Sequence, residues 1–179
     1  MFKSIRTTSQ ERVFWGILGA LFLSMLGAAV LPILWNNLMG ATLGGILSAF
    51  GAVYGYEKFG EKLTVKGLVI SIVISVIVLI AAWHIGLSLD VYRVYKEFYA
   101  SGDVNFEITF GQALANPYEF FDIFAATGRY ITILLYSVYI CLFASGCLVV
   151  EFRNEMKKIK LIAKEQVQMN SNEAQITDD

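Results

Sequence analysis

The residues best suited to catalysis are few, and His84 is the only histidine in the chain. It stands beside Trp83, and Asp90 follows nearly two helical turns later, so no carboxylate is placed to complete a metal site with it. A single histidine in a membrane can sense or relay protons. We favour the simpler interpretation, in which His84 lies at the membrane interface and hydrogen-bonds to water or to a carbonyl group.

Two groups of charged residues have spacings that acid–base chemistry or cation binding uses. Glu119 and Asp122 are three residues apart and share one face of a helix, but no nucleophile or histidine is near them. The second group borders an apolar segment and consists of Glu57, Lys58, Glu61 and Lys62. Charges are expected at a membrane boundary in any case, so we interpret both groups as solvated.

No other pattern of residues supports catalysis. The chain contains no GxSxG, HExxH, P-loop or GxGxxG sequence. Cys141 and Cys147 lie in an apolar run, and their spacing turns them about 120° apart on a helix. We expect apolar fillers rather than a disulfide or metal ligands. The sequence thus predicts no catalytic, cofactor-binding or metal-binding residue and no cofactor, and we expect that the protein is not an enzyme.

Composition points instead to a membrane. Of the 179 residues, 56% are hydrophobic and 16% are charged, whereas soluble domains carry about 25% charged residues. The net charge of −1 lacks the basic face that nucleic acid requires. Residues 13–56 contain no Asp, Glu, Lys or Arg and are long enough for two spans of about 20 residues.

The sequence Gly27-Ala28-Ala29 loosely fits a signal-peptide cleavage site. Because the first apolar span continues past it, we expect this span to be retained in the protein.

The fold class that follows is an all-α membrane protein with four transmembrane helices and amphipathic helices in the loop between the third and the fourth. We place the spans at about residues 13–34, 38–56, 67–89 and 130–150, within a transmembrane domain of residues 13–150. Residues 1–12 form a cytoplasmic lead. Residues 151–179 form a basic cytoplasmic helix, followed from about Gln168 by a disordered tail.

Small residues recur every four positions in the first two spans. They are Gly16, Ala20, Ser24 and Ala28 in the first span and Gly40, Gly44, Ser48 and Ala52 in the second. Because lipid gives helices no hydrophobic reason to associate, such rows favour close backbone contact. We interpret them as the interface of an antiparallel helix hairpin, in preference to a pore lining or a self-association face. Ser71 and Ser75 are expected to bond back to their own helix or across to a neighbour.

The loop of residues 90–128 should carry two helices. The first presents an apolar stripe suited to the membrane interface, formed by Val91, Val94, Tyr95 and Phe98. The second begins at Asn116-Pro117-Tyr118-Glu119, which has the form of a helix start, and ends near Gly128. It is too short to span a membrane and should lie on the surface or dip partway in. The segment through Arg129 holds six acids and three basic residues, and we regard this loop as the place for recognition.

Basic residues predict the orientation of the chain. Eleven Lys and Arg residues lie on the side of the two termini, against three on the side of the long loop. The positive-inside rule therefore places both termini in the cytoplasm of a cell membrane. The basic helix carries Arg153, Lys157, Lys158, Lys160 and Lys164. These residues are expected either to attract anionic lipids of the inner leaflet or to act as ordinary positive-inside anchors.

Residues 51–67, GAVYGYEKFGEKLTVKG, form a glycine-rich helix end followed by an aromatic and charged turn. In this feature the chain resembles small, mostly uncharacterised multi-pass membrane proteins of Gram-positive bacteria, over about residues 13–150. The resemblance implies a bacterial membrane protein and implies no activity. Some of these proteins carry an N-terminal zinc ribbon, but this chain has no such cysteines, so nothing related to metal carries over.

These features favour a non-enzymatic accessory, assembly or protective (immunity-like) protein. Its partners would be the lipid bilayer and a membrane protein or a second copy of the chain, and not nucleic acid. The alternative is a subunit of a small oligomeric transporter or channel. However, the central part of each span lacks the acidic or basic residues that coupled transport usually needs. A lipid-acting membrane enzyme would need the boundary carboxylates to act catalytically.

The orientation is testable with reporter fusions at Gly102 and at the C-terminus. A reporter that is active only in the cytoplasm is expected to work at the C-terminus and to fail at Gly102, because the basic residues favour the inner side. A reporter that is active only outside should give the reverse pattern. An outside C-terminus would overturn the predicted topology.

Overall fold

The computed structural model describes residues 11–35, 38–120 and 127–177, and every regular element in them is helical. The elements are α1 (Val13–Ala28), α2 (Val30–Ile33), α3 (Leu38–Gly60), α4 (Val65–Ser101), α5 (Phe110–Ala115), the 3₁₀ turn η2 (Pro117–Phe120) and α7 (Thr127–Thr177). Within the described part, four segments are long and apolar enough to cross a membrane: Val13–Ile33, Leu38–Gly60, Val65–Ser101 and Gly128–Gln168. The predicted all-α class with four spans is confirmed.

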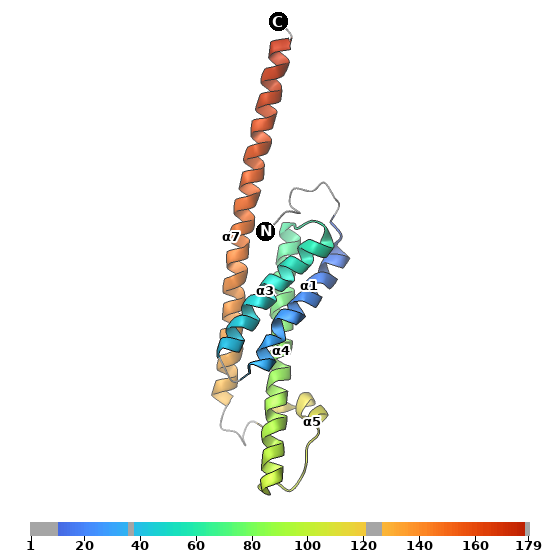
Figure 1. Ribbon diagram of the computed structural model, residues 1–179, viewed down its shortest axis with the longest axis vertical. Coiled ribbons are helices and arrows are strands. Elements are labelled where there is room, and N and C mark those ends of the chain that lie inside the picture. Colours follow the sequence, from blue (N-terminus) through green and yellow to red (C-terminus); the bar gives the residue numbers. More distant parts are fainter. Residues whose placement is uncertain (1–10, 36–37, 121–126, 178–179) are drawn as a thin grey trace.

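The four long helices form an up-down-up-down bundle (Figure 1). α1 and α3 pack side by side in opposite directions and share the most extensive interface, while α4 and α7 complete the bundle. α4 continues well beyond the bundle at one end, where α5 packs against it. α7 continues beyond the bundle at the opposite end (Figure 1). The long loop and the C-terminal extension therefore project from opposite ends of the bundle.

The predicted rows lie only partly between α1 and α3: Ser24 bonds to Ser48 across this interface, whereas Gly40 and Gly44 lie against Leu34 and Leu31. The closest α1–α3 contacts are made by glycines outside the two predicted rows. A Cβ atom added to Gly19 would lie 2.5 Å from the carbonyl oxygen of Gly55. A Cβ atom added to Gly51 would lie 2.5 Å from the carbonyl oxygen of Leu23. Real Cβ atoms do not come this close to a backbone atom, so only glycine permits this helix separation. The small-residue rows therefore serve packing within the chain.

A chain of buried hydroxyl and thiol groups links the four long helices. The Ser24 hydroxyl lies 2.8 Å from that of Ser48. Ser48 in turn donates to the Ser75 carbonyl oxygen at 3.2 Å, and the Ser75 hydroxyl lies 3.4 Å from the sulfur of Cys141. Ser71 and Ser75 also donate to carbonyl oxygens of their own helix, as expected. These bonds satisfy polar groups that would otherwise face hydrocarbon.

Three helices run further than the sequence analysis placed them. α3 continues through Gly60, and α4 passes without a break from the third span into the predicted amphipathic segment. α7 likewise passes from the fourth span through the basic helix and on to Thr177, where a disordered tail was expected. The physical reason is shared: no proline interrupts these segments, so a change from apolar to polar residues alters the surroundings of a helix without ending it.

Gly55 and Gly146 provide a matched pair for testing the α1–α3 contact. Changing either residue to alanine should raise helix propensity by about 1 kcal/mol. An added Cβ atom at Gly146 meets nothing within 4 Å, whereas one at Gly55 would clash with the Gly19 backbone. We expect Gly55→Ala to lower the free energy of unfolding in detergent by about 1–3 kcal/mol through overpacking, and Gly146→Ala to leave it equal or higher. Equal stability of the two variants would contradict the close α1–α3 contact.

Candidate functional site

The part of α4 that leaves the bundle supports a folded loop. With 37 residues, α4 is about 55 Å long, which exceeds the roughly 30 Å thickness of membrane hydrocarbon. The helix ends at Ser101 and is capped by Gly102, whose φ of 83° is left-handed and suits glycine. The backbone amide of Asp103 donates to the Phe98 carbonyl oxygen at 3.0 Å and reverses the chain. We call the surface formed by residues 90–120 the loop platform.

Apolar residues of the returning loop cover the outer part of α4. Val91 and Tyr95 are 0% and 1% exposed, and they share a core cluster with Ile108 and Ala113 of the loop. The Phe106 ring lies 5.4 Å from that of Tyr95. The stripe of Val91, Val94, Tyr95 and Phe98 was expected to face the membrane interface. This is wrong for Val91 and Tyr95, because the loop of the same chain buries them, while Val94 and Phe98 are half-buried.

His84 joins the loop platform to the bundle. Its Nε2 atom lies 2.9 Å from the Leu114 carbonyl oxygen, and since a carbonyl only accepts, Nε2 carries the proton. The Nδ1 atom is then free to accept from the Tyr118 hydroxyl, which lies 3.4 Å away. This arrangement matches the simpler interpretation of His84, a histidine bonded to a carbonyl group. Among the described residues, no group of three His, Cys, Asp or Glu residues could hold a metal ion.

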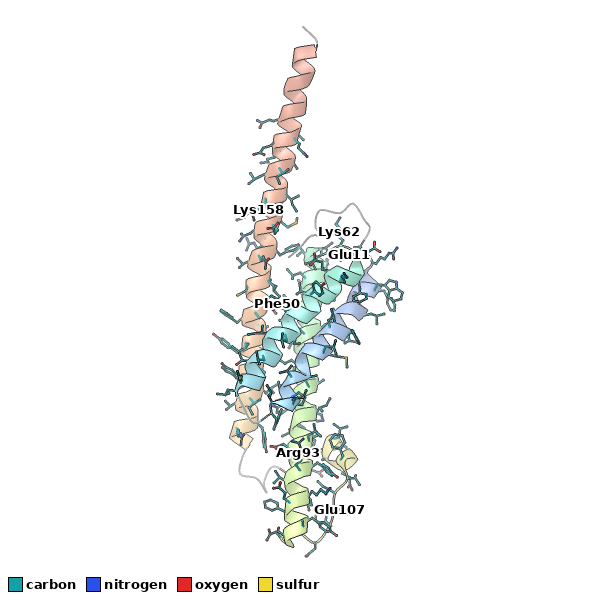
Figure 2. The ribbon with its side chains drawn as sticks, viewed as in Figure 1. Glu11, Phe50, Lys62, Arg93, Glu107 and Lys158 are labelled. Carbon is teal, nitrogen blue, oxygen red and sulfur yellow. The ribbon has the colours of Figure 1, made fainter. Side chains whose placement is uncertain are left out.

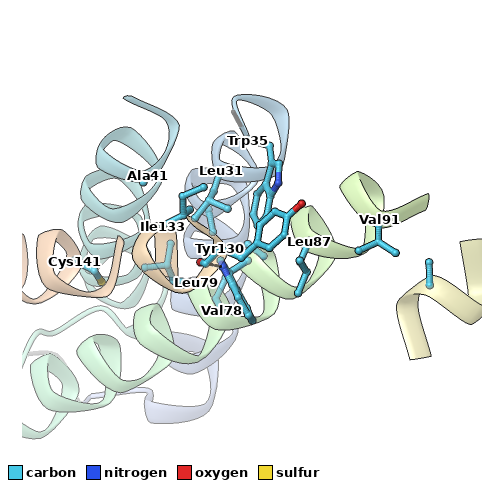
Figure 3. Packing of buried hydrophobic residues seen from close by; sticks show 14 of the residues in the cluster. Leu31, Trp35, Ala41, Val78, Leu79, Leu87, Val91, Tyr130, Ile133 and Cys141 are labelled. Carbon is cyan, nitrogen blue, oxygen red and sulfur yellow. Dashed lines mark hydrogen bonds between the residues drawn. The ribbon is translucent and has the colours of Figure 1, made fainter. Parts of the chain in front are cut away.

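Three aromatic residues close the bundle below the loop platform. The Trp83 indole donates to the Tyr130 carbonyl oxygen at 3.0 Å, and the Trp35 ring stacks on the Tyr130 ring with centroids 6.2 Å apart (Figure 3). The Tyr130 hydroxyl donates to Asp90 at 2.9 Å. Asp90 is therefore engaged with α7 rather than with His84. This junction fixes the start of α7 against the point where α4 leaves the bundle.

The exposed side of the loop platform combines aromatic and acidic side chains. Exposed apolar and aromatic residues are Tyr99, Phe106, Phe110, Leu114 and Tyr118. Exposed acids are Glu97, Asp103, Glu107 and Glu119. Figure 2 shows Glu107 and Arg93 at this end, far from Glu11 and Lys62 at the other. Aromatic side chains are enriched at protein–protein interfaces.

The signal for α5 was overlooked in the sequence. Thr109 and Gln112 form a capping box. The backbone amide of Gln112 donates to the Thr109 hydroxyl, and the backbone amide of Thr109 donates to the side-chain oxygen of Gln112. At the expected second helix start, the structure shows the short turn η2, in which Asn116 donates to Glu119. Asp122, the partner expected for Glu119, lies outside the described residues.

The charged group at the opposite end of the bundle is a structural link. Glu11 accepts hydrogen bonds from the Tyr56 and Thr64 hydroxyls at 2.7 and 2.8 Å. Arg12 pairs with Glu61 at 3.0 Å, while Lys58 is exposed and Lys62 half-buried. Glu57 is largely buried at 8% exposure, so the expectation that this whole group is solvated is wrong for Glu57, which lies inside α3 as it packs into the bundle. These contacts tie the start of α1 to the turn between α3 and α4, a role that the sequence did not reveal for Glu11.

The two cysteines point to different sides of α7, as their spacing predicts. Cys141 is fully buried in the hydroxyl chain, whereas Cys147 is exposed on α7. Only Cys141 is therefore the apolar filler that was expected of both.

No family model, no curated protein and no solved structure matches this chain. The class is therefore defined by the fold and the site alone. The chain is a multi-pass membrane protein with a folded loop platform at one end of its bundle and a charged helical extension at the other.

His84→Ala is expected to loosen the loop platform. Loss of a hydrogen bond worth about 1 kcal/mol should raise the open population of the loop about fivefold. Hydrogen exchange of residues 110–118 in the detergent-solubilised protein measures this population. Ile85→Ala is the control, because Ile85 is adjacent in sequence and 44% exposed, and it should leave the exchange unchanged. Equal exchange in the two variants would show that His84 does not hold the loop.

Proposed function

We propose that the protein is a non-enzymatic accessory, assembly or protective (immunity-like) protein of a bacterial cell membrane. It acts by binding a membrane-protein partner through the loop platform. The observation that carries the proposal is the set of exposed aromatic and acidic side chains on this platform, where Phe106 and Tyr118 are 61% and 50% exposed. Such side chains supply large contact area together with charge selectivity.

The construction of the loop platform supports a role in binding. Its backbone is held by the capping box at Thr109, by the His84 bond to Leu114 and by burial of Ile108 and Ala113. A surface that is ordered before it meets its partner loses less conformational entropy on binding. The same surface offers a partner four exposed acids against two exposed basic residues, Arg93 and Lys96. A basic partner surface is therefore favoured.

The distribution of basic residues supports an orientation with both termini in the cytoplasm. Nine described Lys and Arg residues, from Arg12 to Lys164, lie at the end from which α7 extends, against three at the other end. In this orientation the loop platform faces outward. The basic part of α7 lies at the inner leaflet, where we propose that it contacts anionic lipids.

Photo-crosslinking in cells tests the platform proposal. A benzophenone side chain at Phe106 is expected to form an adduct with one partner protein. The control position is Phe143 of α7, which is equally exposed at 64% but lies in a membrane span. Glu107→Lys should weaken the adduct at Phe106 about tenfold or more, since a reversed charge faces the partner, and Glu165→Lys on the α7 extension should not.

Two results would contradict the proposal. An adduct at Phe106 no stronger than that at Phe143 would show that the platform is not the recognition surface, and one insensitive to Glu107→Lys would show that the acids do not select the partner. Solute flux through proteoliposomes, together with a solubilised mass of several copies, would favour the oligomeric transporter or channel instead.

A further inference from the structure

A small cavity lies where α7 leaves the bundle beside the first residue of α4. Its volume is about 280 Å³, and its lining consists of Val65, Phe152, Arg153, Met156, Lys157 and Lys160. Phe152 is 3% exposed and belongs to the core cluster that closes this end of the bundle. The cavity therefore has an apolar floor and three cationic groups at its rim. We call it the basic notch.

Charges are separated by sign around this part of α7. At about 100° per residue, Arg153, Lys157, Lys160 and Lys164 fall within about 60° of one another. Glu151 and Glu155 lie on a different side, where Glu155 pairs with Lys158 at 3.1 Å. Among the described residues that line the basic notch there is no acid. The three cations of the notch thus face a common space, and an anion there would be attracted by all of them.

Repulsion between the three cations of the notch destabilises this part of α7, and a bound anion would relieve it. Lys157 lies four residues after Arg153 and three before Lys160, so both pairs are neighbours of like charge on one helix face. The start of α4 adds to the attraction for an anion, because a helix N-terminus carries partial positive charge. Thr64 caps this end by accepting from the Gly67 amide at 3.1 Å.

The basic notch lies just beyond the apolar part of the bundle, which in a bilayer borders the headgroup layer. Phe152 and Val65 stand at the end of the apolar bundle, and Lys160 is about 12 Å further along α7 than Phe152. The headgroup layer on each side of a bilayer is about 5–8 Å thick, so Arg153 and Lys157 fall within it. Val65 and Val69 of α4, 63% and 56% exposed, continue the apolar floor toward the hydrocarbon.

We propose that the basic notch binds the headgroup of one anionic phospholipid. Arg153 and Lys157 contact the phosphate, and Lys160 reaches back toward it because side chains on a helix lean toward its N-terminus. The glycerol region and first acyl carbons lie on Phe152 and Val65. The apolar floor favours a lipid over free phosphate, which gains nothing from it. The inference rests on the proposed contact between the basic helix and anionic lipids, and it turns a diffuse attraction into a discrete site that holds one lipid.

Lys157 and Lys158 form a matched pair for testing the notch. They are adjacent and have the same chemistry, but only Lys157 lines the notch, while Lys158 pairs with Glu155. The purified full chain in neutral detergent is titrated with phosphatidylglycerol or phosphatidylcholine, and bound lipid is counted by native mass spectrometry. We expect one tightly bound phosphatidylglycerol, about fivefold weaker binding in Lys157→Gln, and unchanged binding in Lys158→Gln. Both lysines are exposed, and thermal melting confirms that each variant is folded.

The remaining outcomes distinguish a failure of the discrete lipid site from a failure of the general attraction of the basic helix to anionic lipids. Equal weakening by Lys157→Gln and Lys158→Gln would overturn the discrete site and leave the diffuse attraction intact. No preference for phosphatidylglycerol over phosphatidylcholine in the unmodified chain would overturn both. Displacement of the lipid by an equal concentration of inorganic phosphate would show that the apolar floor contributes nothing, which would overturn the lipid as occupant.

Discussion

The close approach of α1 and α3 is the contact on which the rest of the bundle depends. In lipid, two apolar helices gain nothing from excluding water, so their association must come from dispersion contacts and hydrogen bonds at short range. Glycine at positions 19 and 55 allows backbone to touch backbone. This separation also brings Ser24 within hydrogen-bonding distance of Ser48, and the hydroxyl chain then extends to α4 and α7. Small side chains thereby allow a polar connection to form across the bundle interior.

Much of the fold follows from patterns that short stretches of sequence contain. The four spans are visible because charge is absent over each of them, and the hairpin interface is visible because its small residues repeat at the helical period. The ends of the helices were harder to predict from the sequence. Residues such as Asp90 and Glu151 mark where water or headgroups begin, and the sequence analysis took them as ends of helices. In α4 and α7 the environment changes there while the backbone hydrogen bonds continue.

The candidate site was only partly predictable, for a related reason. The acidic and aromatic loop was identified as the place for recognition, but the stripe of Val91 and Tyr95 was assigned to the membrane. An amphipathic stripe indicates that one face of a helix is buried, but it does not indicate whether lipid or another part of the protein covers that face. Here the cover is a loop from the same chain, and the residues that hold it, His84 and Leu114, are thirty positions apart. Such long-range partners leave no local pattern.

α4 joins the two ends of the molecule through one unbroken helix. Its first residue, Val65, lines the basic notch, and its last turns, near Tyr95, form the floor of the loop platform. Because the helix is about 55 Å long, a tilt of about ten degrees around its start moves the far end by about 10 Å. The basic notch and the loop platform are thus parts of one continuous helix. If the proposed lipid and the proposed partner bind at these two sites, both contact the same rigid element from opposite sides of the bilayer.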